Sequence, residues 1–191
     1  ETASEAVKQV LKQTRADVRK EQVGDIGKIY LHIDGSGSMQ EAIEFAKERG
    51  AIIAECVKNP QENFRWGIFN TQGSELPLPK EFIADAFKAV LFGISADGGT
   101  DAFALYPNAR AFGASIDAFV SDQDHNTGPL DEKIKLFHEQ NPNLPKPQAC
   151  VIVDYGGGQR GGIKTAYEAN GIPVSLLKPD TLMESALVSE S

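Results

Sequence analysis

Short apolar runs alternate with helical patterns along most of this chain. Buried strands are predicted where the runs are rich in β-branched, aromatic and aliphatic residues, at 29–33, 64–70, 115–120, 149–153 and 173–177. Helices are predicted where apolar residues recur with helical spacing, at 39–57, 80–91, 102–112, 130–139, 163–169 and 181–188. A short antiparallel edge strand is predicted at 74–78, because Pro77 and Pro79 suit an edge. The alternation predicts a doubly wound α/β fold with a mostly parallel sheet, one antiparallel edge strand and helices on both faces.

The length is that of one full-sized domain. The chain has 191 residues, of which 41% are hydrophobic, so it can bury a proper core. We assign residues 26–191 to the α/β domain. Residues 1–25 hold a separate amphipathic pattern, with a helix predicted over 2–22. This helix is expected to be either the last helix of a preceding domain or a brace across the sheet.

Charge and composition exclude some classes of protein. The chain has 19 basic and 27 acidic residues, a net charge of -8, so a phosphate-driven nucleic-acid surface is not expected on this domain alone. No stretch approaches the roughly 20 apolar residues of a membrane span, and there is no signal peptide, so we expect a cytoplasmic protein without membrane contact. Cys56 and Cys150 lack metal-ligand spacing and are expected to be buried free thiols, with a disulfide as the alternative.

The first predicted strand ends in a loop rich in oxygen ligands. Asp34, Ser36 and Ser38 alternate with glycines, which let the backbone bend so that a carboxylate and two hydroxyls converge. Such a loop lies at the carboxyl end of a strand, where open α/β sheets bind ligands. Oxygen donors of this kind suit Mg²⁺. The alternative is a polar turn in which Ser38 caps the next helix.

Two further loops are expected at the same edge of the sheet. Thr100 lies in the Gly-Gly-Thr-Asp sequence 98–101, directly before a predicted helix. Ser121 and Asp122 directly follow another predicted strand. Because the carboxyl ends of parallel strands meet at one edge, these loops should approach the Asp34 loop.

The order of the elements and the spacing of these motifs resemble the von Willebrand factor A family, also called the integrin I-like fold, over residues 26–188. In that family the residues matching Asp34, Ser36, Ser38, Thr100 and Asp122 form the metal-ion-dependent adhesion site. The resemblance implies that they bind Mg²⁺, or Mn²⁺ in its place. It also implies a protein partner that presents an exposed Asp or Glu to the metal.

Within this family, the sequence around Thr100 and Asp122 also resembles the A domain that closes the Ro autoantigen (TROVE) proteins, which bind small noncoding RNAs. There the A domain follows a ring of helical repeats, and a helix at 2–22 would suit the exit from such a ring. This resemblance implies RNA binding on another part of the protein.

We expect a binding module and not an enzyme. The rival function is a Mg²⁺-assisted phosphohydrolase, in which the metal polarises a phosphoryl oxygen. Its candidate nucleophiles or bases are Asp34, Asp122, Asp124 and His125, and the three loops contain no lysine or arginine to balance phosphate charge. A second rival is a scaffold that has kept the fold and lost its metal.

Other patterns are given structural roles. Residues 156–161 match G-x-G-x-x-G, with Asp180 at the distance of a dinucleotide fingerprint. Only one predicted strand follows, however, so we expect a loop beside the metal edge instead. His32 is expected in the core with its hydrogen bonds satisfied, and His138 on a helix surface.

Overall fold

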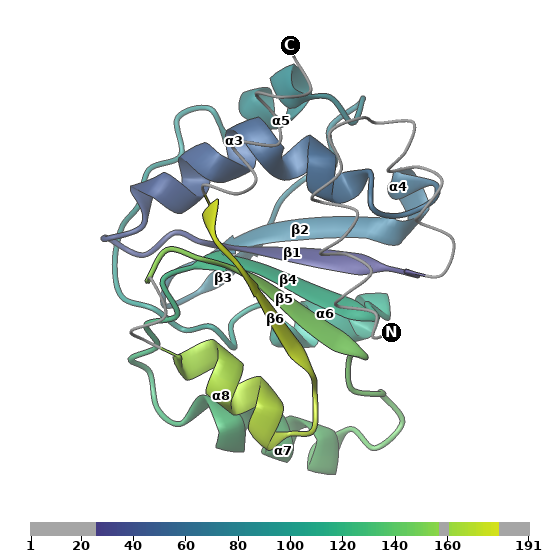
Figure 1. Ribbon diagram of the computed structural model, residues 1–191, viewed down its shortest axis with the longest axis vertical. Helices are drawn as coiled ribbons and strands as arrows, with labels where there is room; N and C mark the ends of the chain where they lie inside the picture. Colours follow the sequence, from purple (N-terminus) through teal and green to yellow (C-terminus); the bar gives the residue numbers. More distant parts are fainter. Residues whose placement is uncertain (1–25, 157–160, 180–191) are drawn as a thin grey trace.

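A six-stranded sheet forms the centre of the structure, a computed structural model that describes residues 26–156 and 161–179. The strands are β1 (Ile29–Asp34), β2 (Phe64–Phe69), β3 (Gly73–Glu75), β4 (Ile116–Ser121), β5 (Ala149–Asp154) and β6 (Val174–Leu177). Their order across the sheet is β3-β2-β1-β4-β5-β6 (Figure 1). β3 runs antiparallel to β2, and the other neighbouring pairs are parallel. The predicted fold class is confirmed.

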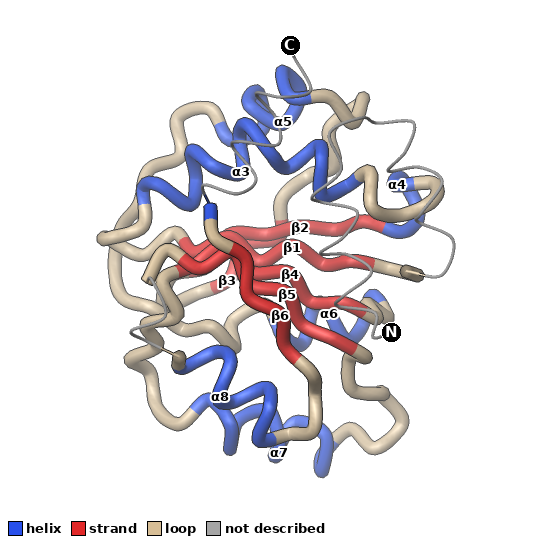
Figure 2. The backbone as a smooth tube through the Cα atoms, in the orientation of Figure 1, coloured by secondary structure: helices blue, strands red, loops and turns tan. Residues whose placement is uncertain are grey.

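Helices cover both faces of this sheet, as Figure 2 shows in blue around the red strands. The described helices are α3 (Gln40–Ala54), α4 (Pro60–Asn63), α5 (Ala84–Leu91), α6 (Tyr106–Phe112), α7 (Leu130–Gln140) and α8 (Gly162–Ala169). α3 and α5 pack against one face of the sheet and form one hydrophobic core with it. α6, α7 and α8 pack against the opposite face and form a second core.

The central strands are buried on both faces. Every residue of β1, β4 and β5 is buried, which explains their nearly continuous apolar sequences. The three residues of β3 are all exposed, as expected for an edge strand. Because β1 and β4 are neighbouring parallel strands, their last residues lie side by side at the carboxyl-terminal end of the sheet.

Two helices begin later than the sequence predicts. α6 starts at Tyr106 and not at residue 102, because Pro107 is tolerated only in the first turn of a helix. α5 starts at Ala84, and Ile83 before it has an extended backbone. Extended residues alternate in direction, so Phe82 packs against Phe87 while Ile83 is 51% exposed and not inward as predicted. The predicted helices at 2–22 and 181–188, and most of the 156–161 loop, lie outside the described residues.

A buried ionic cluster lies between the sheet and α6 and α8. The Arg110 guanidinium donates to Asp117 Oδ1 at 2.6 Å, and the Tyr167 hydroxyl donates to Asp117 Oδ2 at 2.5 Å. His32 is fully buried, but its Nε2 is 3.5 Å from Asp117 Oδ1, which is long for a hydrogen bond. The predicted core location of His32 is confirmed, whereas neither ring nitrogen has a hydrogen-bond partner among the described residues.

The structure also places both cysteines and His138. Cys56 and Cys150 are buried free thiols, as predicted. His138 lies on α7 and is partly buried, with its ring hydrogen-bonded to Tyr106. Within 26–156 and 161–179, no helix is long and apolar enough to cross a bilayer.

Candidate metal-binding site

Asp34 is the fully buried last residue of β1, and hydroxyl groups hold both of its carboxylate oxygens. Oδ1 accepts a hydrogen bond from the Ser36 hydroxyl at 2.6 Å and a second from the Ser36 backbone N–H at 3.0 Å. Oδ2 accepts from the Ser121 hydroxyl at 2.6 Å. Three hydrogen bonds therefore fix the orientation of this carboxylate before any ligand binds.

The loop after Asp34 turns sharply and is tied to the loop that carries Thr100. The backbone N–H of Gly37 donates to the Gly98 carbonyl at 2.9 Å, and that of Asp97 donates to the Gly35 carbonyl at 2.8 Å. Ser36 is 3% exposed, whereas Ser38 is exposed just before α3. Ser38 is not the cap of this helix, because the N-cap residue is Met39.

The Thr100 backbone is hydrogen-bonded to the loop that follows β4. Its backbone N–H donates to Asn126 Oδ1 at 3.1 Å, and its carbonyl accepts from the Thr127 hydroxyl at 3.0 Å. Asp122 directly follows β4 and is 8% exposed, with Oδ1 accepting from the Asp124 N–H at 3.0 Å. The loops that carry the expected ligands thus meet at one edge of the sheet, linked by hydrogen bonds between their backbones and side chains.

The electrostatics of this edge favour a positively charged ligand. Burial raises the pKa of the Asp34 carboxyl above its ordinary value, although the hydrogen bonds from Ser121 and Ser36 oppose the effect. The negative charge of Asp122 raises that pKa further. A negative charge near the poorly solvated Asp34 carboxylate disfavours its ionised form, and a cation bound beside Asp34 would remove this penalty.

The residues present fit a hard cation. The Ser36 and Ser121 hydroxyls each donate their hydrogen to Asp34, which leaves the Ser36 oxygen able to accept or to coordinate, whereas the Ser121 oxygen already accepts from the Gln123 N–H. Neutral hydroxyls and carboxylates are the donor set that Mg²⁺ and Mn²⁺ accept. Over residues 26–156 and 161–179, no group of three or more His, Cys, Asp and Glu side chains is arranged to hold a metal. The expected metal ligands include only two carboxylates, and the other three are hydroxyl groups, so they do not form a group of that kind.

Sequence reasoning missed the roles of Ser121 and Gln123. Ser121 was placed in a loop without a role, but it is the last residue of β4 and holds Asp34. Its oxygen also accepts from the Gln123 N–H at 2.9 Å, and Gln123 Oε1 accepts from the Lys164 N–H in the first turn of α8 at 2.9 Å. The position of Ser121 directly before the expected aspartate was the signal in the sequence. Gln123 has no sequence signal, because its partner lies 41 residues away.

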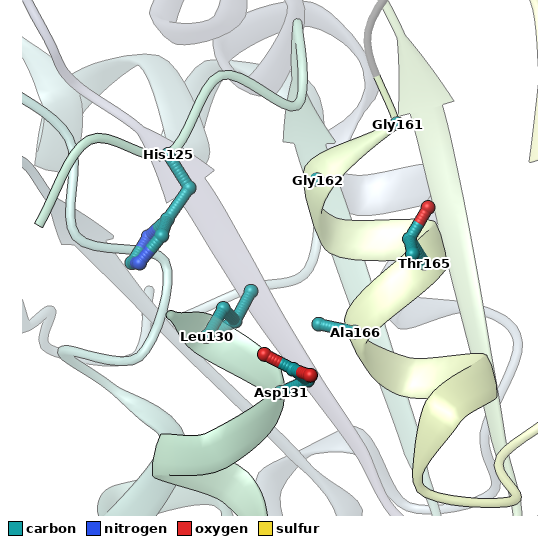
Figure 3. Close-up of a pocket in the computed structure, with 7 residues that line it drawn as sticks. All are labelled: His125, Leu130, Asp131, Gly161, Gly162, Thr165 and Ala166. Carbon is teal, nitrogen blue, oxygen red and sulfur yellow. The ribbon is translucent and has the colours of Figure 1, made fainter. Parts of the chain in front are cut away.

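The His125 ring contacts the segment that follows the Thr100 loop. Its Nδ1 accepts from the Ala102 N–H at 3.1 Å, and its buried Nε2 has no hydrogen-bond partner among the described residues. Burial lowers the pKa of this imidazole. Figure 3 shows its ring beside a groove of about 420 Å³ between the starts of α7 and α8, with the ring nitrogens turned away from α8.

Comparisons with known proteins support the fold. No protein-family model and no curated protein sequence matches the chain. Among solved structures, a conserved hypothetical protein BatB from Bacteroides thetaiotaomicron superposes with a TM-score of 0.53 at 16% identity, covering 86% of this chain and 98% of that one. An aerotolerance-related membrane protein from Bacteroides fragilis, with multiple mutations to serines, has a TM-score of 0.52 at 14% identity and covers 86% and 95%.

These likenesses extend over nearly the whole of both neighbours. At such low identity they show the α/β fold and not a shared activity. The six-stranded, mostly parallel sheet is consistent with the von Willebrand factor A or Rossmann-like fold expected from the sequence.

Proposed function

We propose that this chain is a divalent-metal-dependent protein-binding module. Asp34, Ser36, Ser38, Thr100 and Asp122 hold Mg²⁺, or Mn²⁺ in its place, and the metal receives an Asp or Glu of a protein partner. The observation that carries the proposal is the buried Asp34 carboxylate, whose oxygens are held by the neutral hydroxyls of Ser36 and Ser121. This arrangement orients a carboxylate without neutralising it.

Each part of the site contributes to this role. Ser36 and Ser121 hold Asp34 in one orientation, which reduces the entropy lost when a ligand binds. The hydrogen bonds of the Thr100 backbone fix its position between the neighbouring loops. When bound, Mg²⁺ supplies positive charge and a coordination position that an additional anionic oxygen can fill.

The overall charge favours a single carboxylate from a protein over a polyanion. The net charge of -8 repels nucleic acid and other polyanions at long range. An isolated Asp or Glu on a partner surface carries one charge and experiences less repulsion. The loops around residues 71–79, 93–101, 121–129 and 155–162 are expected to frame the contact, and residues 157–160 of the last loop lie outside the described residues.

Binding is proposed in preference to catalysis. A Mg²⁺-assisted phosphohydrolase needs a positioned base or nucleophile near the metal, and His125 is the candidate with a suitable ordinary pKa. Its ring nitrogens are buried or occupied by the Ala102 N–H, so it is not placed to take a proton at the open edge. Lys133 of α7 approaches this region, but its ammonium is paired with Asp101 at 3.4 Å. A screen with generic phosphoesters tests the choice, and metal-dependent turnover that Asp34→Ala abolishes would reverse it.

Two wider expectations from the sequence stay predictions. One is a place within a Ro-like RNA-binding protein, with the RNA bound by another part of that protein. The other is a cytoplasmic location. One structural neighbour is described as a membrane protein, so fractionation of the source cells is the measurement that decides the location.

Calorimetry tests the metal site directly. Mg²⁺ and Mn²⁺ should each bind the wild-type chain with a stoichiometry of about one, and Asp34→Asn should abolish the binding. Asp85→Asn is the matched control, because it makes the same chemical change at an exposed residue of α5, away from the candidate metal site. No heat of binding at millimolar metal would contradict the proposal.

A pull-down tests the partner. Proteins captured from the source cells by the wild-type chain should be released by EDTA and should not be captured by Asp34→Asn. Recovery of the same proteins, or of RNA alone, regardless of EDTA and of this substitution would show that the metal does not mediate the binding.

A further inference from the structure

Gln123, the residue directly after Asp122, has a backbone conformation that residues other than glycine seldom adopt. Its φ is +65°, in the left-handed region. Among the described non-glycine residues, Asn59 is the other one with a positive φ, and asparagine tolerates this region better than glutamine does. Residues in sparsely populated conformations gather at functional sites, where the surrounding contacts hold them in place.

The Gln123 side chain is buried and reaches α8. It is 1% exposed, and its amide Oε1 accepts a hydrogen bond from the Lys164 backbone N–H at 2.9 Å. That N–H can only donate, so the orientation of the amide is fixed, and Nε2 has no hydrogen-bond partner among the described residues. A buried donor without an acceptor destabilises a fold. Neither backbone preference nor hydrogen-bond satisfaction explains glutamine at this position, which points to a role in the site.

The backbone around Gln123 is joined to both expected carboxylate ligands. The Gln123 N–H donates to the Ser121 hydroxyl oxygen at 2.9 Å, and that hydroxyl donates to Asp34 Oδ2 at 2.6 Å. On its other side, the Asp124 N–H donates to Oδ1 of Asp122 at 3.0 Å. A change in the conformation of this turn would therefore reach Asp34 through Ser121 and Asp122 through the chain.

The start of α8 packs closely on the same turn. A Cβ at Gly162, the first residue of α8, would lie 2.8 Å from the Gln123 carbonyl oxygen, so a side chain there would force the two segments apart. The N-cap residue Gly161 makes no side-chain hydrogen bond to the helix. The Gln123 amide supplies the missing cap, because it satisfies an N–H of the first helical turn.

We propose that Gln123 is a positioning residue for the metal site, which holds the turn that orients Asp122 by docking its side chain on α8. The inference rests on the proposed function, because Gln123 acts on the affinity for the metal and is not itself a ligand. Without the anchor on α8 the strained turn can relax toward negative φ, and the Asp122 carboxylate then moves relative to Asp34. The coupling is reciprocal, so a metal that holds Asp122 in place also stabilises the hydrogen bond between Gln123 and Lys164.

Gln123→Met tests the anchor. Methionine has a similar length and volume and fills the buried position, but its sulfur is only a weak acceptor for the Lys164 N–H. Calorimetry should show an Mg²⁺ affinity about tenfold below that of wild type.

Gln123→Gly separates the strained backbone from the side chain. Glycine adopts the left-handed conformation without strain, so the turn keeps its shape without an anchor, and the Mg²⁺ affinity should lie between those of wild type and Gln123→Met. If Gln123 only filled space, Gln123→Gly would reduce the affinity more than Gln123→Met, because it removes the whole side chain.

Asn170→Leu is the matched control. Asn170 follows the last residue of α8, and its amide donates to the Asp131 carbonyl at 3.1 Å. The substitution removes an amide contact at the opposite end of the same helix, so stability in urea should fall while the Mg²⁺ affinity stays within about twofold of wild type.

Hydrogen exchange of the Lys164 amide tests the coupling without any variant. This N–H lies in the first turn of α8 and is protected by the Gln123 side chain, so saturating Mg²⁺ should slow its exchange in wild type by about fivefold. In Gln123→Met the exchange should be fast with and without the metal.

The outcomes separate this inference from the proposed function. If the wild-type chain binds neither Mg²⁺ nor Mn²⁺ in calorimetry, the proposed function is wrong and this inference falls with it. If wild type binds the metal but folded Gln123→Met binds it equally well, or if Mg²⁺ leaves the exchange of the Lys164 amide unchanged, Gln123 does not position the site while the function stands. A loss of affinity in Asn170→Leu as large as that in Gln123→Met would also overturn the inference.

Discussion

The Ser121 hydroxyl donates a 2.6 Å hydrogen bond to Asp34 Oδ2 and so joins the ends of two neighbouring parallel strands. Both residues are fully buried, so water cannot replace this contact. Oδ2 makes no other hydrogen bond among the described residues, so Ser121 holds this oxygen while Ser36 holds Oδ1. The contribution of Ser121 can be tested separately from the metal ligands.

Ser121→Ala should reduce both stability and metal affinity. A buried carboxylate oxygen that loses its hydrogen-bond donor costs about 1–3 kcal/mol, so the free energy of unfolding in urea should fall by that amount. Because the carboxylate is then held only by the Ser36 hydrogen bonds to Oδ1, Mg²⁺ affinity should fall as well, by about tenfold in calorimetry.

Ser38→Ala provides the comparison. Ser38 is exposed, so the free energy of unfolding without metal should change by less than about 0.5 kcal/mol. Its effect should appear only in Mg²⁺ affinity. Equal losses of stability in Ser38→Ala and Ser121→Ala would contradict the distinction between a ligand and a positioning residue.

Gly50→Ala should destabilise the chain, although alanine usually stabilises a helix by about 1 kcal/mol relative to glycine. A Cβ at Gly50 in α3 would lie 2.5 Å from Cδ1 of Phe87 in α5. Phe87 is fully buried against the Trp66 ring, so it has little room to move. We expect a net loss of about 1–2 kcal/mol in the free energy of unfolding.

A double-mutant cycle identifies the cause. In a Phe87→Leu background the ring is absent, and Gly50→Ala should then be neutral or stabilising because only its helix preference remains. A similar loss with and without the ring would mean that the clash with Phe87 is not the source.

Acid should weaken the fold through Asp117. Burial alone would raise the pKa of this carboxyl, but the Arg110 guanidinium and then His32 lower it to about 2. A pKa below the unfolded value, near 3.9, means that the carboxylate stabilises the fold above pH 4. This contribution is lost as the pH falls from about 4 to 2.

Tyr167→Phe isolates this contribution, because the Tyr167 hydroxyl donates to Asp117 Oδ2. Removing a hydrogen bond to a charged group should lower the free energy of unfolding by about 1.5–3 kcal/mol at pH 6. The difference from wild type should shrink between pH 4 and pH 2, where Asp117 becomes protonated. Urea unfolding across pH 2–6 measures it, and a difference independent of pH would contradict the assignment.

His138 should give a separate loss of stability between neutral and mildly acid pH. Its Nδ1 lies 3.1 Å from the Leu144 carbonyl, which can only accept, so Nε2 accepts from the Tyr106 hydroxyl at 2.6 Å. Burial lowers the pKa of this imidazole, so the neutral ring stabilises the fold above the unfolded pKa near 6.5.

That contribution should be lost as the pH falls through the lower pKa of the folded state, with a slope of at most about 1.4 kcal/mol per pH unit. His138→Gln removes the titrating group, so its unfolding free energy should depend less on pH between 7 and 5. Identical pH profiles for wild type and His138→Gln would show that His138 does not contribute.

The sequence by itself determined the fold class and the edge where the candidate site lies. The strands β1, β4 and β5 can be recognised from their apolar sequences, because strands buried on both faces are composed mainly of apolar residues. The positions of Asp34 at the end of one such strand and of Asp122 directly after another follow from the chain order alone. Pro107 also indicates where α6 begins, because proline is favoured in the first turn of a helix.

Only the tertiary structure decided which side chains hold Asp34 and what surrounds them. Ser121 and Asp34 are 87 positions apart, and Asp117 and Tyr167 are 50 apart. Periodicity reports which face of an element is buried but not which residue it meets, because that depends on strand register and helix packing. The contact between Gly50 and Phe87 and the hydrogen bond between Gln123 and α8 arise in the same way, from segments that folding brings together.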